Sequence, residues 1–459
     1  MDVAVIGAGP VGLMLAAELR LGGATPVVLD RRAAPDRRPR ANGLGGRIVE
    51  QLDHRGLLDR FRAEAGFAGP VPGFPFGPVP LDFARLDRPM LGLMLQQPRM
   101  EALLADRAAE LGVEIRRGHE LLDLDTVRGP AGEYVLHADY VVGCDGAHSR
   151  VRELAGIGFP GTTDDELMRL GHFRADLDPF TTVQGLERGW NRRPGGRVLV
   201  TSLTPGVVIA GVREVAPEPP GEPTLGEFRD AVRRVLGADL PLGEPLWLSR
   251  TVSSARLAER YRAGRVLLAG DAAHVFPAGG SSLNVGLLDA VNLGWKLAAV
   301  VRGEADGSLL DTYHAERHPV AARTLTQTRV QALLDRLTGE NGDALRTLFG
   351  ELAAFEAPTR HLAGLLHDAD ELPYVPDLPL TVGGRPTRVA EIMRAARPVL
   401  FDFADRADLR EAAGPRVKIV TAACPEAPAD ALFVRPDGVV AWQGGDPAAL
   451  REAMTAPGR

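Results

Sequence analysis

Cysteine is scarce in this 459-residue chain, and metal-binding patterns are missing. Its two cysteines, Cys144 and Cys424, lie far apart and form no CxxC pair, so neither a disulfide framework nor a thiolate metal site is expected. The ten histidines form no HExxH motif and no other paired-ligand spacing. The sequence therefore predicts no bound metal.

Long apolar runs and a strong net charge are also missing. No segment approaches the roughly 20 apolar residues of a membrane span, and the first residues lack the basic region and cleavage site of a signal peptide. We therefore expect a cytoplasmic protein without membrane contact. The 53 basic and 60 acidic residues leave a net charge of −7, which argues against general binding to nucleic acid. The length and the 45% of hydrophobic residues allow two or three packed domains.

The first thirty residues follow the pattern of a βαβ unit. The apolar run 3–6 predicts a strand, a glycine-rich turn follows, and apolar residues at helical spacing lead to a second buried strand in "TPVVLDRR". The turn contains Gly7-x-Gly9-x-x-Gly12, a weak signal by itself in a chain with 53 glycines. Its place between strand and helix, with Asp30 ending the next strand, predicts a site for a nucleotide pyrophosphate and ribose.

A second strand–loop–helix pattern occurs at residues 265–297. The apolar run "RVLLA" ends at Gly270-Asp271, and a helix is predicted to begin near Asn284. Asp271 can accept hydrogen bonds from sugar-alcohol hydroxyls, and the helix N-terminus can stabilise negative charge on a heterocycle such as a reduced flavin. An ordinary capped helix after an Asx turn would explain Asp271 and Asn284 singly, so both interpretations stay open at this point.

The remaining chain divides into two further regions. Between about 155 and 264, the strand-like "RVLVTSL" and "GVVIAGV" and the helical "TLGEFRDAVRRVLG" predict a mixed α+β domain inserted into the first domain. Beyond the Pro-rich "PDLPLTVGGRP", the segments "RPVLFDF", "RVKIVTA" and "ALFVRPDGVVAWQG" predict strands of a small α/β domain. The predicted fold class is α/β, with a discontinuous Rossmann-like domain at its centre.

Four separated blocks together resemble the p-hydroxybenzoate hydroxylase type of FAD-dependent monooxygenases. They are "GAGPVGLMLAAELRLGG…VVLDRR", "PRANGL", "VVGCDGAHSRVR" and "RAGRVLLAGDAAHVFPAGGSSLNVGLLDAVNLGWKLAAV". The resemblance covers nearly the whole chain. It is strongest with the subgroup that hydroxylates aromatic polyketides and rifamycin-type compounds, whose members carry a thioredoxin-like C-terminal domain without the redox CxxC.

The resemblance implies a division of the chain into domains. The implied ranges are 1–70, 92–155 and 264–338 for the FAD-binding domain, 71–91 and 156–263 for the substrate-binding domain, 339–385 for a helical linker, and 386–459 for the thioredoxin-like domain.

The resemblance also implies a set of FAD contacts. The glycines of the first motif would lie at the pyrophosphate, and Asp30 on the adenosine ribose. Arg40 and Gln97 would lie near the ribityl chain and the flavin, although without the family pattern a solvated charge and a surface helix start would explain them. The motif Asp145-Gly146 would be linked to FAD and to the nicotinamide donor. The complete set of expected cofactor-binding residues is Gly7, Gly9, Pro10, Val11, Gly12, Asp30, Arg31, Arg40, Gln97, Leu121, Asp145, Gly146, Gly270, Asp271, Gly280, Ser281, Ser282, Leu283 and Asn284.

Three departures from the family pattern bear on the FAD site. The backbone from Gly280 to Asn284 would face the flavin pyrimidine, but this loop is one residue shorter than usual and has Ser281-Ser282 in place of Gln-Gly. Serine in place of glycine restricts the backbone, so the position or movement of the flavin is expected to differ. The segment before "ADYVVGCDG" is short, which trims the adenine edge. Asp30 replaces the usual Glu and keeps the carboxylate.

The activity implied by the resemblance is aromatic hydroxylation. NADPH or NADH, visiting transiently, would reduce FAD, O2 would form a flavin C4a-hydroperoxide, and one oxygen atom would go to an electron-rich ring. The flavin carries this chemistry, so no catalytic side chain is predicted. Few polar anchors stand out in the inserted domain, which favours a bulky aromatic substrate, and the enzyme is expected to be a monomer or a homodimer.

Several alternatives remain at the level of sequence. The same scaffold could perform Baeyer–Villiger insertion, epoxidation or simple dehydrogenation, whereas the absence of a WxWxIP stretch argues against a flavin halogenase. A flavin- or ligand-binding protein without efficient turnover is a second alternative. An NAD-dependent dehydrogenase that uses only the N-terminal motif is a third.

Overall fold

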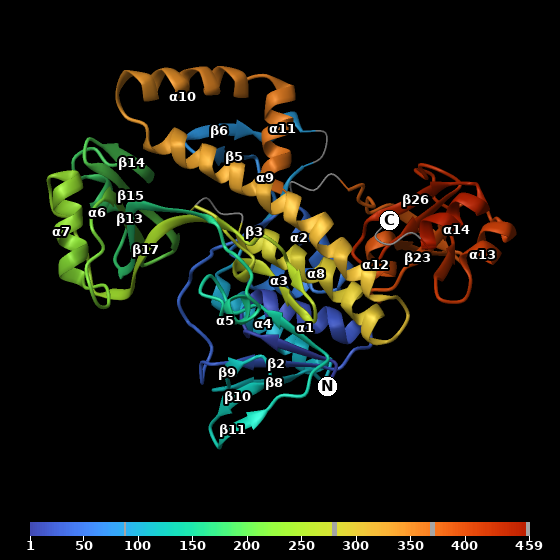
Figure 1. Cartoon of the computed structure of the whole chain (residues 1–459). Coiled ribbons are helices and arrows are strands. Elements are labelled where there is room, and N and C mark those ends of the chain that lie inside the picture. Colours follow the sequence, from blue (N-terminus) through green and yellow to red (C-terminus); the bar gives the residue numbers. More distant parts are fainter. Residues whose placement is uncertain (87–88, 278–281, 368–371, 456–459) are drawn as a thin grey trace.

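The central layer of the molecule is a six-stranded sheet. The computed structural model describes residues 1–86, 89–277, 282–367 and 372–455 (Figure 1). The strand order is β18 (Arg262–Ala263), β19 (Val266–Leu268), β12 (Tyr140–Gly143), β1 (Val3–Ile6), β2 (Pro26–Asp30) and β8 (Glu114–Arg117). All neighbours are parallel except β18 and β19. This is the doubly wound α/β sheet predicted from the N-terminal βαβ unit.

Three helices pack beside this sheet and bury its core. They are α1 (Pro10–Leu21), α4 (Gln97–Glu110) and α8 (Ser282–Val301), and α1 contacts both of the others. The fit between α1 and α8 is tight because a Cβ built on Gly294 would lie 2.4 Å from the Cβ of Glu18. Between β8 and β12 the chain forms the antiparallel meander β9 (Glu120–Asp123), β10 (Thr126–Gly129) and β11 (Gly132–Val135).

A second six-stranded sheet follows from the middle of the chain. Its order is β14 (Gly189–Arg193), β15 (Gly196–Thr204), β16 (Val207–Val215), β13 (Gly161–Arg174), β17 (Pro245–Leu257) and β20 (His274–Val275). Helix α7 (Leu225–Leu236) covers one face, where Phe173 packs on Phe228 with ring centroids 5.3 Å apart. Thr224 caps α7 by accepting the backbone N–H of Glu227. The two strands and the helix predicted for this region are confirmed.

Two smaller sheets and three further helices lie outside the two six-stranded sheets. The strands β3 (Leu44–Gly45), β7 (Leu91–Met94) and β4 (Phe67–Pro70) form one sheet, and β5 (Gly73–Phe76) pairs with β6 (Val79–Asp82). The β5–β6 hairpin shares an apolar cluster with α9 (Asp311–Arg336), α10 (Gly339–Ala353) and α11 (Glu356–His367). The division of these segments into domains stays a prediction.

The C-terminal region has a four-stranded sheet in the order β24 (Lys418–Thr421), β23 (Val399–Asp402), β25 (Ala431–Val434) and β26 (Val440–Gly444). The β23–β24 pair is parallel and the other two pairs are antiparallel. Helix α13 (Ala407–Ala413) connects β23 to β24, and α14 (Pro447–Thr455) follows β26. This β-α-β then β-β-α order confirms the thioredoxin-like prediction, and Cys424 beside it is a free thiol.

Buried ion pairs attach the C-terminal region to the helices of the first domain. The guanidinium of Arg435 donates to Glu316 of α9 at 2.8 and 2.9 Å, and Trp295 of α8 donates to Asp437 at 3.0 Å. Arg55 donates to Glu18 of α1 at 2.6 and 2.8 Å and to the carbonyl of Pro436 at 2.8 Å. Since the removal of one partner would leave an uncompensated buried charge, these contacts hold the two regions in one orientation.

Among the described residues, no helix combines the length and the apolar character needed to cross a bilayer. Within the same ranges, no three His, Cys, Asp or Glu side chains gather in a way that could hold a metal ion.

Candidate functional site

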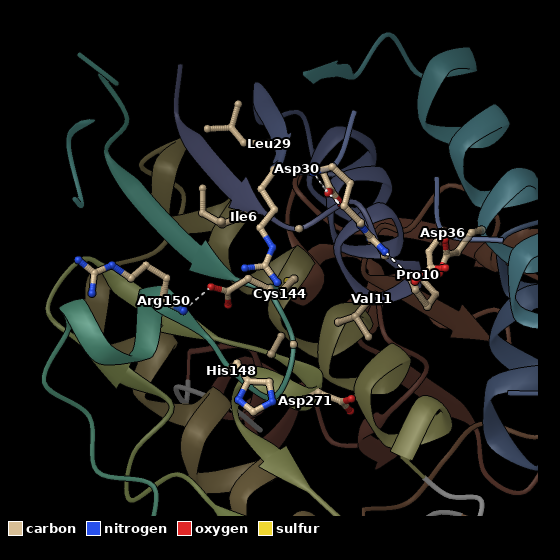
Figure 2. Close-up of a pocket in the computed structure, with 18 of the residues that line it drawn as sticks. Ile6, Pro10, Val11, Leu29, Asp30, Asp36, Cys144, His148, Arg150 and Asp271 are labelled. Carbon is tan, nitrogen blue, oxygen red and sulfur yellow. Dashed lines mark hydrogen bonds and ion pairs between the residues drawn. The ribbon is translucent and has the colours of Figure 1, made fainter. Parts of the chain in front are cut away.

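A cleft of about 710 Å³ opens at the carboxyl ends of the parallel strands (Figure 2). Its lining includes residues at or just beyond the carboxyl ends of four strands. These are Gly7 after β1, Asp30 at the end of β2, Asp145 after β12 and Asp271 after β19. Ligands of open α/β sheets bind at this edge because the loops diverge there and leave a crevice. The topology therefore brings together motifs that are up to 264 positions apart in the sequence.

Most of the sequence-predicted site residues line this cleft. These are Gly7, Gly9, Pro10, Val11, Asp30, Arg31, Arg40, Gln97, Leu121, Asp145, Gly146, Asp271, Ser282 and Leu283. The residues Gly12, Gly270 and Asn284 are not part of the lining. The predicted residues Gly280 and Ser281 lie outside the described residues, so the expected effect of the short Ser281-Ser282 loop stays a prediction.

Each of the three glycines in the first motif is present for a different structural reason. Gly7 has φ +114°, and a Cβ there would lie 2.3 Å from the carbonyl oxygen of Cys144. A Cβ on Gly12 would lie 2.0 Å from the carbonyl oxygen of Gly7, so α1 can approach β1 only without a side chain there. Gly9 precedes α1, and a Cβ there would meet no described atom within 4 Å. The space at Gly9 is therefore left open towards the cleft, next to a helix N-terminus without a side-chain cap.

Asp30 is buried at the floor of the cleft and is held by four N–H donors, one of which is the backbone N–H of Arg32, 2.8 Å from Oδ1. Its Oδ2 accepts the backbone N–H of Ala8 at 2.9 Å, and the Arg32 guanidinium donates to both carboxylate oxygens at 3.2 and 3.1 Å. Burial would raise the pKa of Asp30, but the hydrogen bonds from Arg32 and Ala8 outweigh it and hold the pKa below its ordinary value. Asp30 therefore presents an ionised carboxylate beside the glycine turn.

Arginines gather around a second carboxylate, Asp36, on the same side. Arg32, Arg38 and Arg40 all donate to Asp36, at 3.3, 2.7 and 3.2 Å. The hydrogen bond from Arg38 is the leading reason why the pKa of Asp36 lies far below its usual range. Arg40 is more than half exposed, so its guanidinium can turn towards a ligand at little cost. Nearby, Gln97 at the start of α4 donates to Glu101 at 2.8 Å.

The loop after β12 contributes a carboxylate with an unused oxygen. Asp145 Oδ2 accepts the backbone N–H groups of Arg150 and Val151 at 2.8 and 3.2 Å, whereas its buried Oδ1 has no partner among the described residues. Burial raises the pKa of Asp145 above its ordinary value. Gly146 follows with φ +87° and open space at its Cβ position. This loop can therefore accept a hydroxyl donor and approach a ligand closely.

The turn after β19 presents Asp271 to the cleft. Gly270 has φ +62° and lies under Val11 of α1, and the exposed Asp271 accepts the hydroxyl of Ser282 at 2.6 Å. Ser282 is the first residue of α8, so the carboxylate lies at the N-terminal end of that helix. Asn284 lies in the first turn of α8, where its buried Oδ1 has no partner in the described part of the chain.

A buried charge network supports this turn from below. Asp289 of α8 is fully buried; it accepts the backbone N–H of Gly270 at 3.2 Å, contacts His274 Nε2 at 2.7 Å and accepts Arg317 Nε of α9 at 2.9 Å. Burial would raise the pKa of Asp289, but the charges and hydrogen bonds of His274 and Arg317 hold it below its usual value. The network thus ties α8, α9 and the Gly270 turn together.

Sequence reasoning missed several residues of the lining, among them Arg32, Asp36, Glu101, His148 and Arg150. Figure 2 shows His148 and Arg150 on the side of the cleft opposite Asp36. The available signal was the density of charge directly after two predicted strands, in "DRRAAPDRR" and "DGAHSR". That signal indicates the neighbourhood but not which charges pair.

The site as a whole suits a dinucleotide. Open backbone at a helix N-terminus attracts a pyrophosphate, carboxylates at three strand ends accept sugar hydroxyls, and arginines supply positive charge for an anionic ligand. A model of the FAD binding domain family matches residues 1–328, and a model of the aromatic-ring hydroxylase C-terminal family matches residues 373–457. The chain belongs to the FAD-dependent aromatic-ring hydroxylases. The resemblance inferred from its four sequence blocks is thereby confirmed.

Relatives of this hydroxylase match it over nearly their whole length. It is 42% identical to a rifampicin monooxygenase of Streptomyces venezuelae, covering 99% of this chain and 98% of the relative. It is 41% identical to a 12-dehydrotetracycline 5-monooxygenase/anhydrotetracycline 6-monooxygenase of Streptomyces rimosus subsp. rimosus, covering 96% of this chain and 95% of the relative. The solved structure of an aromatic hydroxylase from angucycline biosynthesis superposes with a TM-score of 0.90 at 38% sequence identity. The match covers 100% of this chain and 99% of that structure's chain.

FAD is the cofactor of this hydroxylase, and the cleft fits it. The open space at Gly9, the uncapped N-terminus of α1 and the unused Oδ1 of Asp145 are features that a bound dinucleotide would complete. The protein is an FAD-dependent monooxygenase. Because the family match extends through residue 328, it favours FAD over the NAD-dependent dehydrogenase considered from the N-terminal motif alone.

Acid release of FAD from this hydroxylase is expected to depend on Arg32. The lowered pKa of Asp30 means that its ionised form stabilises the folded site above about pH 4, and that this contribution is lost as the pH falls through the folded-state pKa. In Arg32→Ala, the guanidinium hydrogen bonds are lost and only backbone N–H donors oppose the effect of burial, so the pKa of Asp30 rises. We expect flavin release, followed by fluorescence during acid titration, to move upward by about one pH unit. Arg37→Ala, which removes an exposed arginine of the same segment that does not line the cleft, should leave the midpoint in place; equal shifts in both variants would contradict a specific role of Arg32.

Proposed function

We propose that this chain is an NAD(P)H-consuming monooxygenase that inserts one atom of O2 into a bulky aromatic compound of the polyketide or rifamycin type. The observation that carries this proposal is the short path from the cofactor cleft to the second sheet. Asp271 lines the cleft, and three positions later β20 begins and pairs with β17 of the second sheet, at His274↔Leu257 and Val275↔Arg256. A ring held on that sheet would therefore lie next to the cofactor.

The assignment of residues to parts of FAD is also part of the proposal. The turn at Gly7, Gly9 and Gly12, with Pro10 and Val11, would hold the pyrophosphate, and Asp30 with Arg31 the adenosine ribose. Arg40, Gln97, Leu121, Asp145 and Gly146 would bind along the cofactor towards the flavin. Gly270 and Asp271 would bind the ribityl chain, and the start of α8 from Gly280 to Asn284 would face the pyrimidine. The supporting observations are the lining of the cleft and the open backbone within it.

The chain's own contribution to catalysis is binding and electrostatics. Bound FAD supplies the electron transfer and oxygen transfer, so no side chain of this protein is assigned as a nucleophile. The N-terminus of α8 and the guanidinium of Arg40 would favour negative charge on the flavin. The buried network around Asp289 would keep the Gly270 turn and α8 in register with the cofactor.

The substrate class rests on the relatives and on the second sheet. The relatives are named for rifampicin and for tetracycline-type compounds, and we propose that this chain accepts a substrate of the same bulky, fused-ring or macrocyclic class. We further propose a cytoplasmic enzyme, a monomer or homodimer, with the division at 71–91, 156–263 and 386–459 expected from the sequence.

The proposal is tested by NADPH and NADH oxidation in air, with the flavin spectrum and hydrogen peroxide recorded for a panel of fused-ring phenols and rifamycins. We expect a yellow protein whose NAD(P)H oxidation accelerates at least tenfold with one compound while peroxide stays low. Mass spectrometry of the product, with a gain of one oxygen atom, then separates ring hydroxylation from dehydrogenation, and fragmentation separates it from Baeyer–Villiger insertion or epoxidation. A yellow protein that every compound leaves at the basal rate would favour flavin binding without turnover instead.

A further inference from the structure

The inner side of α9 carries polar residues where a buried helix face is normally apolar. Thr324, Gln327, Thr328 and Gln331 are between 1% and 5% exposed. Their spacing of three and four residues places them on one face of the helix. We call these four residues the α9 polar stripe. Since glutamine is rarely fully buried without hydrogen-bond partners, the stripe requires an explanation.

The contacts of the residues before and after the stripe on α9 show which parts of the molecule it lies between. Before it, Arg317 donates to Asp289 of α8, the helix that begins at the cofactor cleft. After it, Asp335 accepts Arg192 of the second sheet at 3.2 Å and forms an ion pair with Arg197 of β15. Arg317 and Asp335 share the face of the stripe by helical spacing, so the stripe spans the distance between the cofactor helix and the second sheet (Figure 1).

Asp335, which follows the stripe on the same helix face, meets the side of the second sheet that α7 leaves uncovered. Val198 and Val212 face the α7 cluster, and their neighbours Arg197 and Arg213, paired across β15 and β16, point to the other side. On the same uncovered side, by the same alternation with Phe173, lies His172, which is 4% exposed and whose Nε2 has no partner among the described residues. Burial lowers the pKa of His172, so this ring is neutral near pH 7.

The threonines and the glutamines of the stripe differ in whether their side chains form hydrogen bonds. The hydroxyl of Thr324 donates to the carbonyl of Val320 at 2.9 Å, and that of Thr328 to the carbonyl of Thr324 at 2.8 Å. By contrast, neither the nitrogen nor the oxygen of the Gln327 amide, nor the Gln331 amide nitrogen, has a partner in the described ranges. A leucine at either position would fold at lower cost, since a buried amide without partners loses its hydration.

We propose that Gln327 and Gln331 are specificity-determining residues that hydrogen-bond oxygen substituents of the substrate. This inference rests on the proposed function and extends it. Two glutamines four residues apart are separated by about 6 Å along the helix, which suits hydroxyl or carbonyl groups on different rings of a fused system. The amides offer neutral donors and acceptors, while the nearby Arg197 is engaged by Glu166 and Asp335. The structure therefore assigns the stripe to a neutral, multiply oxygenated polycycle and not to a small benzoate anion.

The test uses the FAD-loaded full-length enzyme and the variants Gln327→Leu and Gln331→Leu. The matched control is Thr328→Val, which removes a polar group of the same stripe that is already satisfied by the helix. The first readout is the thermal midpoint without substrate. We expect both leucine variants to melt at the wild-type temperature or above it, because each removes an unsatisfied polar group. A fall of several degrees in the leucine variants would overturn the inference, since it would show that the amides stabilise the fold.

The second readout is the binding of 1,8-dihydroxyanthraquinone, a neutral fused-ring probe, followed by the perturbation of the flavin absorbance. We expect each leucine variant to raise its Kd by about tenfold, and Thr328→Val to leave it within about twofold. An unchanged Kd in the leucine variants, or a wild-type enzyme that binds 4-hydroxybenzoate but not the anthraquinone, would overturn the inference. If the probe behaves as expected but no compound accelerates NAD(P)H oxidation, the proposed function fails while the ligand contacts of the glutamines stand.

Discussion

Gly9→Ala is expected to fold normally and to lose most of its affinity for FAD. The backbone at Gly9 is extended, with φ −78°, and a Cβ there would meet no described atom within 4 Å, so the protein itself tolerates the methyl group. In the loaded enzyme the methyl would occupy the space through which a pyrophosphate approaches the N-terminus of α1. We expect the Kd of FAD, measured by flavin fluorescence quenching on titration of the apoprotein, to rise roughly a hundredfold, or about 3 kcal/mol.

Two further glycine variants separate binding from folding. Gly12→Ala should destabilise the fold itself, because its Cβ would lie 2.0 Å from the backbone oxygen of Gly7 and neither backbone can yield without moving α1 from β1. Gly226→Ala, in α7 far from the cleft, adds a methyl with no contact closer than 3.9 Å and should leave both the thermal midpoint and FAD binding intact. If Gly9→Ala binds FAD as tightly as Gly226→Ala does, the proposed pyrophosphate site is wrong.

Asp289→Asn is expected to lower the free energy of unfolding by about 3–5 kcal/mol, because it removes the buried negative charge that Arg317 and His274 both contact. Asp289 is fully buried and Arg317 is 2% exposed, so water cannot replace the lost contact. The carboxylate accepts hydrogen bonds from Gly270, His274 and Arg317 with its two oxygens. An asparagine amide has only one oxygen and cannot accept from all three groups at once. Urea unfolding followed by circular dichroism measures the change, and the content of bound FAD should fall with it.

Asp271→Asn is the matched control for this prediction. Asp271 directly follows Gly270 in the same turn, but its side chain is exposed and its described side-chain partner is Ser282. We expect its unfolding free energy to stay within about 0.5 kcal/mol of the wild type, as for other exposed positions. Its affinity for FAD should fall about tenfold if Asp271 holds a ribityl hydroxyl. Equal loss of stability in both variants would show that the Asp289 network has no special weight.

The local parts of the fold could be predicted from the sequence because their determinants are close together in the chain. The run 3–6, the glycine turn and the helix ending before Gly22 need only hydrophobic periodicity and turn chemistry to be recognised as a βαβ unit. The same holds for α7, whose cap Thr224 and terminal Gly237 stand at the predicted ends. The cofactor motifs could also be predicted, because a close backbone approach requires glycine wherever it occurs.

The pairing of charges could not be predicted from the sequence. The segment "DRRAAPDRRPR" offers five arginines to two aspartates, and only the folded loop decides that Arg32 binds both Asp30 and Asp36 while Arg38 and Arg40 bind Asp36. The attachment of Arg435 to Glu316 joins residues 119 positions apart, and neither residue stands in a recognisable motif. Long side chains reach any of several neighbours, so their partners follow from the packing of elements and not from local patterns.

The sequence by itself therefore determined the α/β class, the FAD-binding motifs and the membership in the aromatic-ring hydroxylases, since these depend on residue types at fixed short spacings. Only the tertiary structure decided which side chains lie buried together. It placed the Asp289 network beside the Gly270 turn, and it buried the Gln327 amide and the Gln331 amide nitrogen without hydrogen-bond partners among the described residues. The physical reason is that burial and hydrogen-bond satisfaction are properties of contacts between distant segments, which no single segment encodes.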